Sequence, residues 1–166
     1  MTAQQEHTGD LIDHHLKMVG TLVNNAALCD LVLFSAFKII SGCESKIASA
    51  IYFSSETLNA KKNFITRILK VNGDQKETKL LQRIIAATEK SQNQRNELSH
   101  ALLQVTGDGK KLLRLNARHQ GQPGKPITGL YLEGLLEQSS RAHLEAHKAF
   151  QELCLKRGIP PKVSHE

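Results

Sequence analysis

The spacing of apolar residues constrains the fold of this chain more than any other feature of its sequence. Between about Asp10 and Ile40 the apolar positions recur at three- and four-residue steps. These positions are Ile12, Leu16, Val19, Val23, Ala26, Leu33, Phe37 and Ile40. Such a period places them on one face of an α-helix, and that face needs a partner to cover it. We therefore expect long amphipathic helices packed against one another.

Three further segments carry the same period, and turn-forming residues separate them. The second covers roughly residues 44–71, where the stretch "FSSET" either kinks the helix or restarts it, because Ser and Thr favour caps over helix interiors. Gly73 and Asp74 predict a stop and a new N-cap. The third and fourth segments cover about residues 75–104 and 130–156.

The composition also indicates a helical class. Aromatic residues make up 4% of the 166 residues and Trp is absent, which favours helices packed on helices over a β-sandwich. The predicted fold is all-α: an up-and-down four-helix bundle with a loop or short β-hairpin insert at about residues 105–129, before the last helix. We expect one helical-bundle domain over residues 10–156, a flexible N-terminus over residues 1–9 and a polar tail over residues 157–166.

Positive charge is concentrated in the later part of the chain. Residues 1–60 hold three lysines and six acidic residues, whereas residues 61–166 hold 19 basic and 10 acidic residues. This asymmetry indicates a polyanionic partner such as RNA, with a solvated basic surface as the alternative. The connector before the last helix has no aromatic residue to stack on bases, so its cations would contact phosphate groups. The candidates are Lys110, Lys111, Arg114 and Arg118.

The sequence carries no sign of export or of a disulfide framework. The three cysteines, Cys29, Cys43 and Cys154, are far apart and form no CxxC pair. The N-terminus lacks the apolar core of a signal peptide, and the longest apolar run contains Asp30 and Lys38 and is too short to span a membrane. We expect a cytoplasmic protein without membrane contact.

The third predicted helix places a cation on its apolar face. With about 100° per residue and Ile84 set to zero, Arg95 lies at about 20°, in the middle of the stripe. Asn96 and His100 lie at about 120° and about 160°, as neighbours on one flank. An unpaired charge in a packed core costs several kcal/mol, so this arginine needs a partner or an exit to water.

Three interpretations of Arg95 are open at this point. It pairs with a buried acid, for which Asp30 is the candidate because Asp30 interrupts the stripe of the first helix. It extends its long side chain to water. Or its face borders a cleft or a subunit interface that binds an anion. In that case His100, Asn96 and Arg95 together suit proton transfer next to a phosphate, since His titrates near neutrality.

The segment "RNELSH", Arg95-Asn96-x-x-x-His100, resembles the signature of the HEPN superfamily, the higher eukaryote and prokaryote nucleotide-binding domains. That signature is an Arg, often followed by Asn, Asp or His, with a His four to six residues after the Arg. In the family it lies late in a long helix of a helical bundle. The resemblance is sharp over six residues and loose over the rest of the chain.

The resemblance implies a metal-independent endoribonuclease without a cofactor, in defence, toxin–antitoxin systems or RNA turnover. It implies a homodimer in which two motif copies face one cleft, with His100 as general base or acid, Arg95 stabilising the phosphate and Asn96 orienting either. Other family members bind nucleotides or proteins without cleaving RNA. The alternative is therefore a non-catalytic bundle that binds a nucleotide, RNA, an antitoxin or another regulatory protein. The third hypothesis is a structural helical dimer in which Arg95 pairs with Asp30.

Other patterns in the sequence are weaker. His143 and His147 are spaced to present two metal ligands on one helix face, but no third ligand is near, so we predict no metal site. His14 and His15 point about 100° apart on a helix, and we interpret both as surface residues. The "GDGK" segment lacks the spacing of a phosphate loop and predicts a turn.

Overall fold

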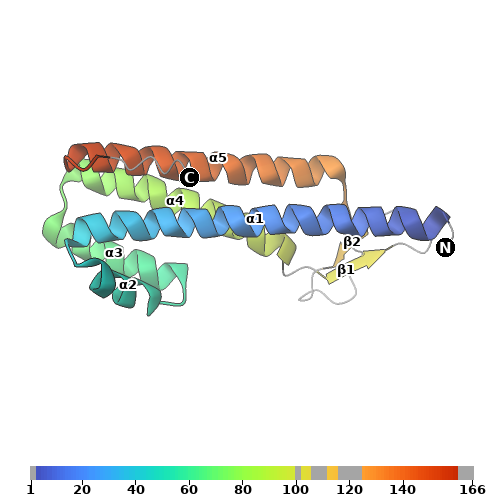
Figure 1. The fold of residues 1–166 in the computed structure, drawn as a ribbon, viewed down its shortest axis with the longest axis horizontal. Coiled ribbons are helices and arrows are strands. Elements are labelled where there is room, and N and C mark those ends of the chain that lie inside the picture. Colours follow the sequence, from blue (N-terminus) through green and yellow to red (C-terminus); the bar gives the residue numbers. More distant parts are fainter. Residues whose placement is uncertain (1–2, 100–101, 106–111, 116–124, 161–166) are drawn as a thin grey trace. The chain divides into compact units, whose positions relative to one another are not determined.

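A computed structural model describes residues 3–99, 102–105, 112–115 and 125–160. Within these residues the chain is mainly helical, which confirms the class that the sequence predicts (Figure 1). The helices are α1 (Ala3–Ser41), α2 (Ser45–Phe53), α3 (Leu58–Asn72), α4 (Gln75–Ser99) and α5 (Gly129–Lys156). The strands are β1 (Leu102–Val105), β2 (Leu112–Leu115) and β3 (Lys125–Ile127). The first helix thus begins at Ala3 rather than near Asp10.

The second predicted helix is divided in two, so the described residues contain five helices where the sequence predicted four. α2 ends at Phe53, and α3 begins at Leu58 after its N-cap residue, Thr57. The Thr57 hydroxyl accepts a hydrogen bond from Ala60 N at 3.2 Å. This bond satisfies one of the backbone N–H groups that the first turn of a helix leaves unpaired. The "FSSET" stretch therefore restarts the helix rather than kinking it.

The predicted stop at Gly73 and N-cap at Asp74 are confirmed. Asp74 Oδ1 accepts from Glu77 N at 2.9 Å, and Glu77 Oε2 accepts from Asp74 N at 3.3 Å, which is a capping box at the start of α4. A Cβ atom at Gly73 would lie 2.7 Å from Leu69 Cδ2 and 2.9 Å from Leu69 O. The turn between α3 and α4 therefore requires glycine for steric reasons.

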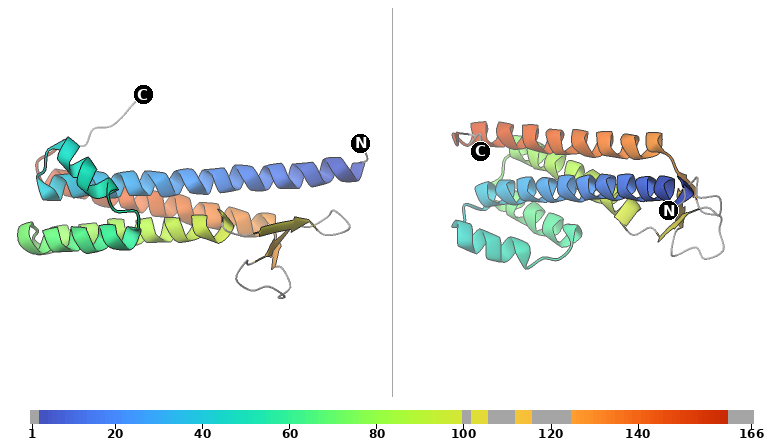
Figure 2. Two further views of the ribbon diagram at one scale, coloured as in Figure 1. Left: turned by 90° about the horizontal axis from the view of Figure 1, so that it is seen from below. Right: turned by 45° about the vertical axis from the view of Figure 1, so that its right-hand side comes forward.

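A three-stranded antiparallel sheet follows α4 in the chain (Figure 2). β1 pairs with β2 in the register Leu102 opposite Leu115, and β2 pairs with β3. Helix α4, the third helix predicted from the sequence, ends at Ser99 and not near Gln104 as predicted. The reason is that the backbone of β1 bonds to a neighbouring strand instead of to the preceding helical turn. Arg114 lies in the middle strand.

The chain forms two compact units. Unit 1 comprises Met1–Ala26 and Ser91–Ser140, and unit 2 comprises Ala27–Lys90 and Arg141–Glu166. Helices α1, α4 and α5 each contribute residues to both units. The single domain expected from the sequence stays a prediction.

Unit 2 has an apolar core to which all five helices contribute. Four of the five phenylalanines and a tyrosine form one group of rings in this unit, with centroids of neighbouring rings 5.1 to 5.7 Å apart. These residues are Phe34, Phe37, Tyr52, Phe53 and Phe64. They lie where α2 and α3 pack beside the C-terminal part of α1 (Figure 1). The low aromatic content of the sequence did not indicate that the few rings would be gathered in one place.

Unit 1 has a smaller apolar core, formed by Leu22, Leu98, Leu132 and Leu135. In this unit the buried face of α1 is not the predicted one: His15 is only 2% exposed, whereas Leu16 and Val23 of the predicted stripe are 57% and 44% exposed. The interpretation of His15 as a surface residue is therefore wrong.

The reason for this error is the choice between two adjacent lines of residues on α1. The buried line includes residues 15, 22, 29 and 36, which follow a seven-residue step. Residues 16 and 23 lie about 100° away from the members of that line that precede them. Apolar character alone favours the line with Leu16 and Val23, but packing buries the other line.

Helix α1 contains a segment that is more apolar than the sequence prediction allowed for. By length and composition its segment Ile12–Ser41 is apolar enough to cross a membrane, although the sequence prediction excluded a span because no uninterrupted apolar run was long enough. In the structure, 39% of the most apolar 18-residue window of this segment is buried inside the protein. Core helices of soluble proteins pass the same test, so this is weak support for a membrane span.

Candidate functional site

Arg95 lies at the edge of the buried face of α4, not in its middle. The side chains of Ser91, Gln94 and Leu98 are buried, whereas Arg95 is half-buried and Asn96 is exposed. The buried line of α4 passes through Ile84, Ser91 and Leu98, and a seven-residue step drifts by about 20° per heptad on a straight helix. The helical projection used for the prediction starts at Ile84 and ignores this drift. It therefore placed Arg95 too close to the centre of the apolar face of α4.

The Arg95 side chain bends toward Asn96, the next residue of the helix. Arg95 Nε and Nη2 both donate to Asn96 Oδ1, at 3.0 and 2.6 Å. Among the described residues Arg95 has no carboxylate partner. The nearest acid in the sequence, Glu97, accepts a hydrogen bond from the Tyr131 hydroxyl instead. The charge of Arg95 is therefore not neutralised by a described neighbour.

The pair formed by Arg95 and Asn96 has a simple chemical consequence. A guanidinium can only donate hydrogen bonds, so the amide of Asn96 must present its oxygen to Arg95. The Asn96 NH2 group then remains as a donor, together with the Arg95 N–H groups that these two bonds do not use. The pair thus offers a second molecule mainly donors and one positive charge. Such a group suits an anion with several acceptor oxygens, such as a phosphate.

The acid predicted as a partner of Arg95 is bonded to other residues. Asp30 lies in unit 2, where Lys61 Nζ contacts its two carboxylate oxygens at 3.0 and 2.8 Å. The Tyr52 hydroxyl also donates to Asp30 Oδ1, at 2.9 Å. The predicted ion pair between Arg95 and Asp30 is therefore wrong, because Asp30 pairs with Lys61. Lys61 lies on α3, and no pattern in the sequence distinguishes it from the other lysines of the chain.

Unit 1 has a polar interior that the sequence analysis missed. Ser91 Oγ of α4 lies 3.2 Å from Ser139 Oγ of α5, and both residues are completely buried. Next to this pair along the two helices, Gln94 Nε2 of α4 donates to Gln138 Oε1 of α5 at 3.2 Å. These paired polar groups lie on the same stretch of α4 as Arg95 and Asn96. The signal was present in "SQNQRNELS", where only one residue of nine is apolar.

Two buried side-chain atoms of unit 1 lack a hydrogen-bond partner among the described residues: His15 Nδ1 and Gln94 Oε1. Burial, with a smaller contribution from the neighbouring His14, lowers the pKa of His15 below its ordinary value. The imidazole of His15 is therefore held in its neutral form at pH 7. An unsatisfied polar atom in a buried place is costly, and such atoms are rare in native structures.

Several predicted site residues lie outside the described residues: His100, Lys110, Lys111 and Arg118. Arg114 is described only through its backbone, in β2. His143 and His147 lie on α5 with ring centroids 6.5 Å apart. In the described part of the chain no three His, Cys, Asp or Glu side chains gather to hold a metal ion.

Comparison of the chain with protein-family models, with curated proteins and with solved structures gave no match. The site must therefore be interpreted from its own chemistry.

Proposed function

We propose that this protein is a HEPN-like, metal-independent endoribonuclease, which acts in defence, in a toxin–antitoxin system or in RNA turnover. The observation that carries the proposal is the pair of Arg95 and Asn96, which presents hydrogen-bond donors and a positive charge without a described carboxylate beside it. A phosphodiester has the complementary property, because it carries a negative charge and its non-bridging oxygens only accept hydrogen bonds. The excess of basic residues in the chain adds long-range attraction for RNA.

In the proposed reaction the RNA supplies its own nucleophile. His100 removes the proton from a ribose 2′-OH, and the 2′ oxygen attacks the adjacent phosphorus. Arg95 and Asn96 bind the non-bridging oxygens, where negative charge increases in the transition state. The bond from phosphorus to the 5′ oxygen then breaks, and the leaving oxygen takes up a proton. The products are a 2′,3′-cyclic phosphate and a 5′-OH end.

A homodimer suits this reaction, because it has two proton transfers and one chain provides a single motif histidine. In the proposed dimer one copy of His100 acts as the base and the other protonates the leaving group. The connector residues Lys110, Lys111, Arg114 and Arg118 would bind flanking phosphates and would make affinity dependent on salt. The proposed location is the cytoplasm, where RNA is available.

The second candidate is a binding module without catalysis, for a nucleotide, RNA, an antitoxin or another regulatory protein. The same observation supports it, since donors at Arg95 and Asn96 can hold a phosphate without any reaction. The third hypothesis is a structural helical dimer. Its pairing of Arg95 with Asp30 is not supported, because Asp30 bonds to Lys61 and Tyr52.

The test is incubation of the purified protein with unstructured RNA in EDTA, with end-group analysis of the products. We expect cleavage by the wild type, and loss of cleavage in Arg95→Gln and His100→Ala. Asn96→Asp is the sharpest variant, because it keeps an acceptor for Arg95 but removes two donors and adds a negative charge. Arg67→Gln, which removes an exposed cation on α3, serves as the control and should cleave normally.

Substrate chemistry separates the two candidates. An RNA with a single 2′-deoxy nucleotide should resist cleavage at that position if the 2′-OH is the nucleophile. Cleavage that persists in all three motif variants would reject the proposed site. Binding of RNA that depends on Arg95, with no cleavage under any of these conditions, would favour the binding module.

A further inference from the structure

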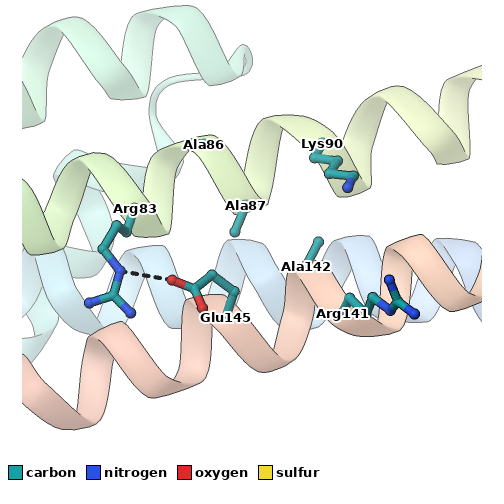
Figure 3. A pocket seen from close by; sticks show the side chains of 7 residues that line it. All are labelled: Arg83, Ala86, Ala87, Lys90, Arg141, Ala142 and Glu145. Carbon is teal, nitrogen blue, oxygen red and sulfur yellow. Dashed lines mark hydrogen bonds and ion pairs between the residues drawn. The ribbon is translucent and has the colours of Figure 1, made fainter.

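Two hollows in unit 2 differ in their chemistry. One lies between α4 and α5, and charged side chains line it on both helices, including the ion pair of Arg83 with Glu145 (Figure 3). The other lies between α1 and α5, and it has a volume of about 600 Å³, within the range of small-molecule sites, about 300–1,000 Å³. We call it the α1–α5 pocket. Lys38 is the only charged residue among the described residues that line it, and most of the others are apolar.

The walls of the α1–α5 pocket that belong to the two helices are anchored in the core of unit 2. Ile39 of α1 and Phe150 of α5 are half-buried and pack against that core. Cys154 of α5 is only 2% exposed, and burial raises the pKa of its thiol, so this wall carries no charge at pH 7. Because side chains in a close-packed core hold their positions, the pocket does not close by rotation of a single wall residue.

The third wall is formed by the residues that follow α5. Gly158 has a φ of +65°, which L-residues rarely adopt, and its N–H donates to Leu155 O at 3.1 Å. Ile159 N donates to Cys154 O at 2.9 Å, so the two bonds form a Schellman motif. This motif turns the chain back toward the last turn of the helix, and Ile159 and Cys154 both line the pocket. Pro160 has a fixed φ and restricts the preceding Ile159 to extended conformations, which stiffens this wall.

Lys38 provides the charge at the exposed end of the pocket, in the last turn of α1. Its side chain is exposed, and none of the ion pairs among the described residues involves it. The hydroxyl of Ser35, one turn earlier on the same helix, donates to Leu31 O at 2.9 Å, which leaves that hydroxyl without a hydrogen for a ligand. The Lys38 ammonium is therefore the charged donor that the described lining offers to a ligand.

We propose that the α1–α5 pocket binds an amphipathic monoanion of the fatty-acid type, with its apolar chain inside and its carboxylate on Lys38. An alkyl chain matches the uncharged walls formed by Ile39, Phe150 and Ile159, because it leaves water there and gives up no hydrogen bond. The ammonium group of lysine is a compact point charge, so one lysine balances one carboxylate. A ligand with several charged or polar groups would leave some of them unmatched between these walls.

This inference goes beyond the proposed nuclease reaction. The pocket lies in unit 2 and contains none of the residues of the Arg95 motif, which lies in unit 1. Its test measures binding of a ligand and not cleavage of RNA. The failure of one proposal therefore leaves the other standing.

The experiment is an NMR titration of the whole chain, labelled at its isoleucine methyl groups, with decanoate below the concentrations at which it forms micelles. Ile39 and Ile159 line the pocket, whereas Ile12 and Ile127 lie in unit 1. We expect saturable shifts of the Ile39 and Ile159 signals and no shift of the Ile12 or Ile127 signals. Octanoate has a shorter chain and should bind on the order of tenfold more weakly, since each buried methylene contributes about fourfold in affinity.

A variant of Lys38 tests the charge. Lys38→Gln should weaken octanoate binding about two- to fivefold, the range for an exposed ion pair, and should leave binding of octanol unchanged, because the alcohol has no charge. Lys46→Gln removes an exposed lysine of α2 that does not line the pocket, so it should leave the binding of both ligands unchanged.

Two variants of Ser35 test the space. Ser35→Leu places an apolar side chain in the pocket and should weaken the binding of octanoate and octanol by about tenfold or more, because the ligand chain loses its buried contacts. Ser35→Ala removes the same hydroxyl and its bond to Leu31 O but leaves the space open, so it should bind as the wild type does. Circular dichroism spectra that match the wild type show that both variants are folded.

Four results would overturn the proposal. The first is a wild type that binds no decanoate, and isoleucine signals of the pocket that change instead with protein concentration would then identify a second copy as the group that covers it. The second is a set of shifts that spreads equally over both units, which indicates a detergent effect. The third is an equal loss of octanoate affinity in Lys38→Gln and Lys46→Gln. The fourth is wild-type affinity in a folded Ser35→Leu variant.

Discussion

The ion pair between Lys61 and Asp30 provides the most demanding test of how unit 2 is held together. The ammonium group contacts both carboxylate oxygens and lies 4.3 Å from the centre of the Tyr52 ring. The side chains of Lys61 and Asp30 are only 10% and 22% exposed. The pair joins α3 to α1, and Tyr52 joins α2 to the same carboxylate.

We expect Lys61→Met to lower the free energy of unfolding by about 2–4 kcal/mol. Methionine keeps an unbranched apolar stem but removes the charge, which leaves a mostly buried carboxylate with the Tyr52 hydroxyl as its remaining donor. Removal of one partner from a fully buried pair costs about 3–5 kcal/mol, whereas an exposed pair contributes about 0–1 kcal/mol. The exposed fraction of Asp30 places this pair between these limits and nearer to the buried one.

The adjacent lysine supplies a matched control. Lys62 forms an ion pair with Glu89, in which the two side chains are 31% and 39% exposed. Lys62→Met makes the same chemical change one residue away and should cost less than about 1 kcal/mol. Both variants are compared with the wild type by urea unfolding, followed by circular dichroism at neutral pH.

A double variant identifies the origin of the loss. If the cost of Lys61→Met comes from the stranded charge, then Lys61→Met/Asp30→Asn should recover about 1–2 kcal/mol relative to the sum of the two single changes. Equal costs for Lys61→Met and Lys62→Met would refute the view that burial makes this pair important. Additive costs in the double variant would show that the two side chains act independently.

Three other predictions follow from the described contacts. Gly73→Ala should lower the free energy of unfolding by about 1–2 kcal/mol in urea, because the added Cβ would overlap the backbone oxygen of Leu69. Gly20→Ala, with open space around its Cβ, should raise it by about 0.5–1 kcal/mol. A loss of stability in both variants would refute the steric reason. Because the pKa of His15 is lowered in the folded protein, the unfolded chain binds more protons, and stability should fall as the pH drops below about 6.5. Unfolding curves at about pH 7.5 and about pH 5.5 measure this loss. His15→Gln should reduce the loss, whereas His14→Gln should retain most of it. Arg95→Gln should cost less than about 1 kcal/mol, because Arg95 is half-buried and bonds to its helical neighbour; a loss as large as that of Lys61→Met would restore the structural role.

Local signals in the sequence were sufficient to predict the helices and several of their ends. The three- and four-residue apolar period depends on the geometry of the helix itself, and the bonds between Asp74 and Glu77 join residues three positions apart. The sequence did not decide whether a helix kinks or a new helix begins near Thr57, since both use the same residue types. Whether Leu102–Val105 continued the helix or formed a strand was decided by pairing with β2, whose residues lie beyond the reach of a helical turn.

The candidate site shows the same division between local and distant information. The Arg95, Asn96 and His100 motif was visible in the sequence, because its spacing is a property of one segment. The depth of Arg95 was not, since it depends on how far the seven-residue line of α4 drifts along the helix. The polar interior of unit 1 and the ion pair of Asp30 with Lys61 join residues 31 to 48 positions apart, so no periodicity predicts them.

The sequence by itself determined that the chain is mainly helical, where several helices begin or end, and which short motif deserves a chemical test. These features rest on interactions within about one helical turn, which each segment carries with it. Only the tertiary structure decided which of two lines of α1 is buried and which lysine neutralises Asp30. Both outcomes depend on which residues face one another across separate helices. Burial and ion pairing arise from the contact between two helices, so neither helix determines them alone.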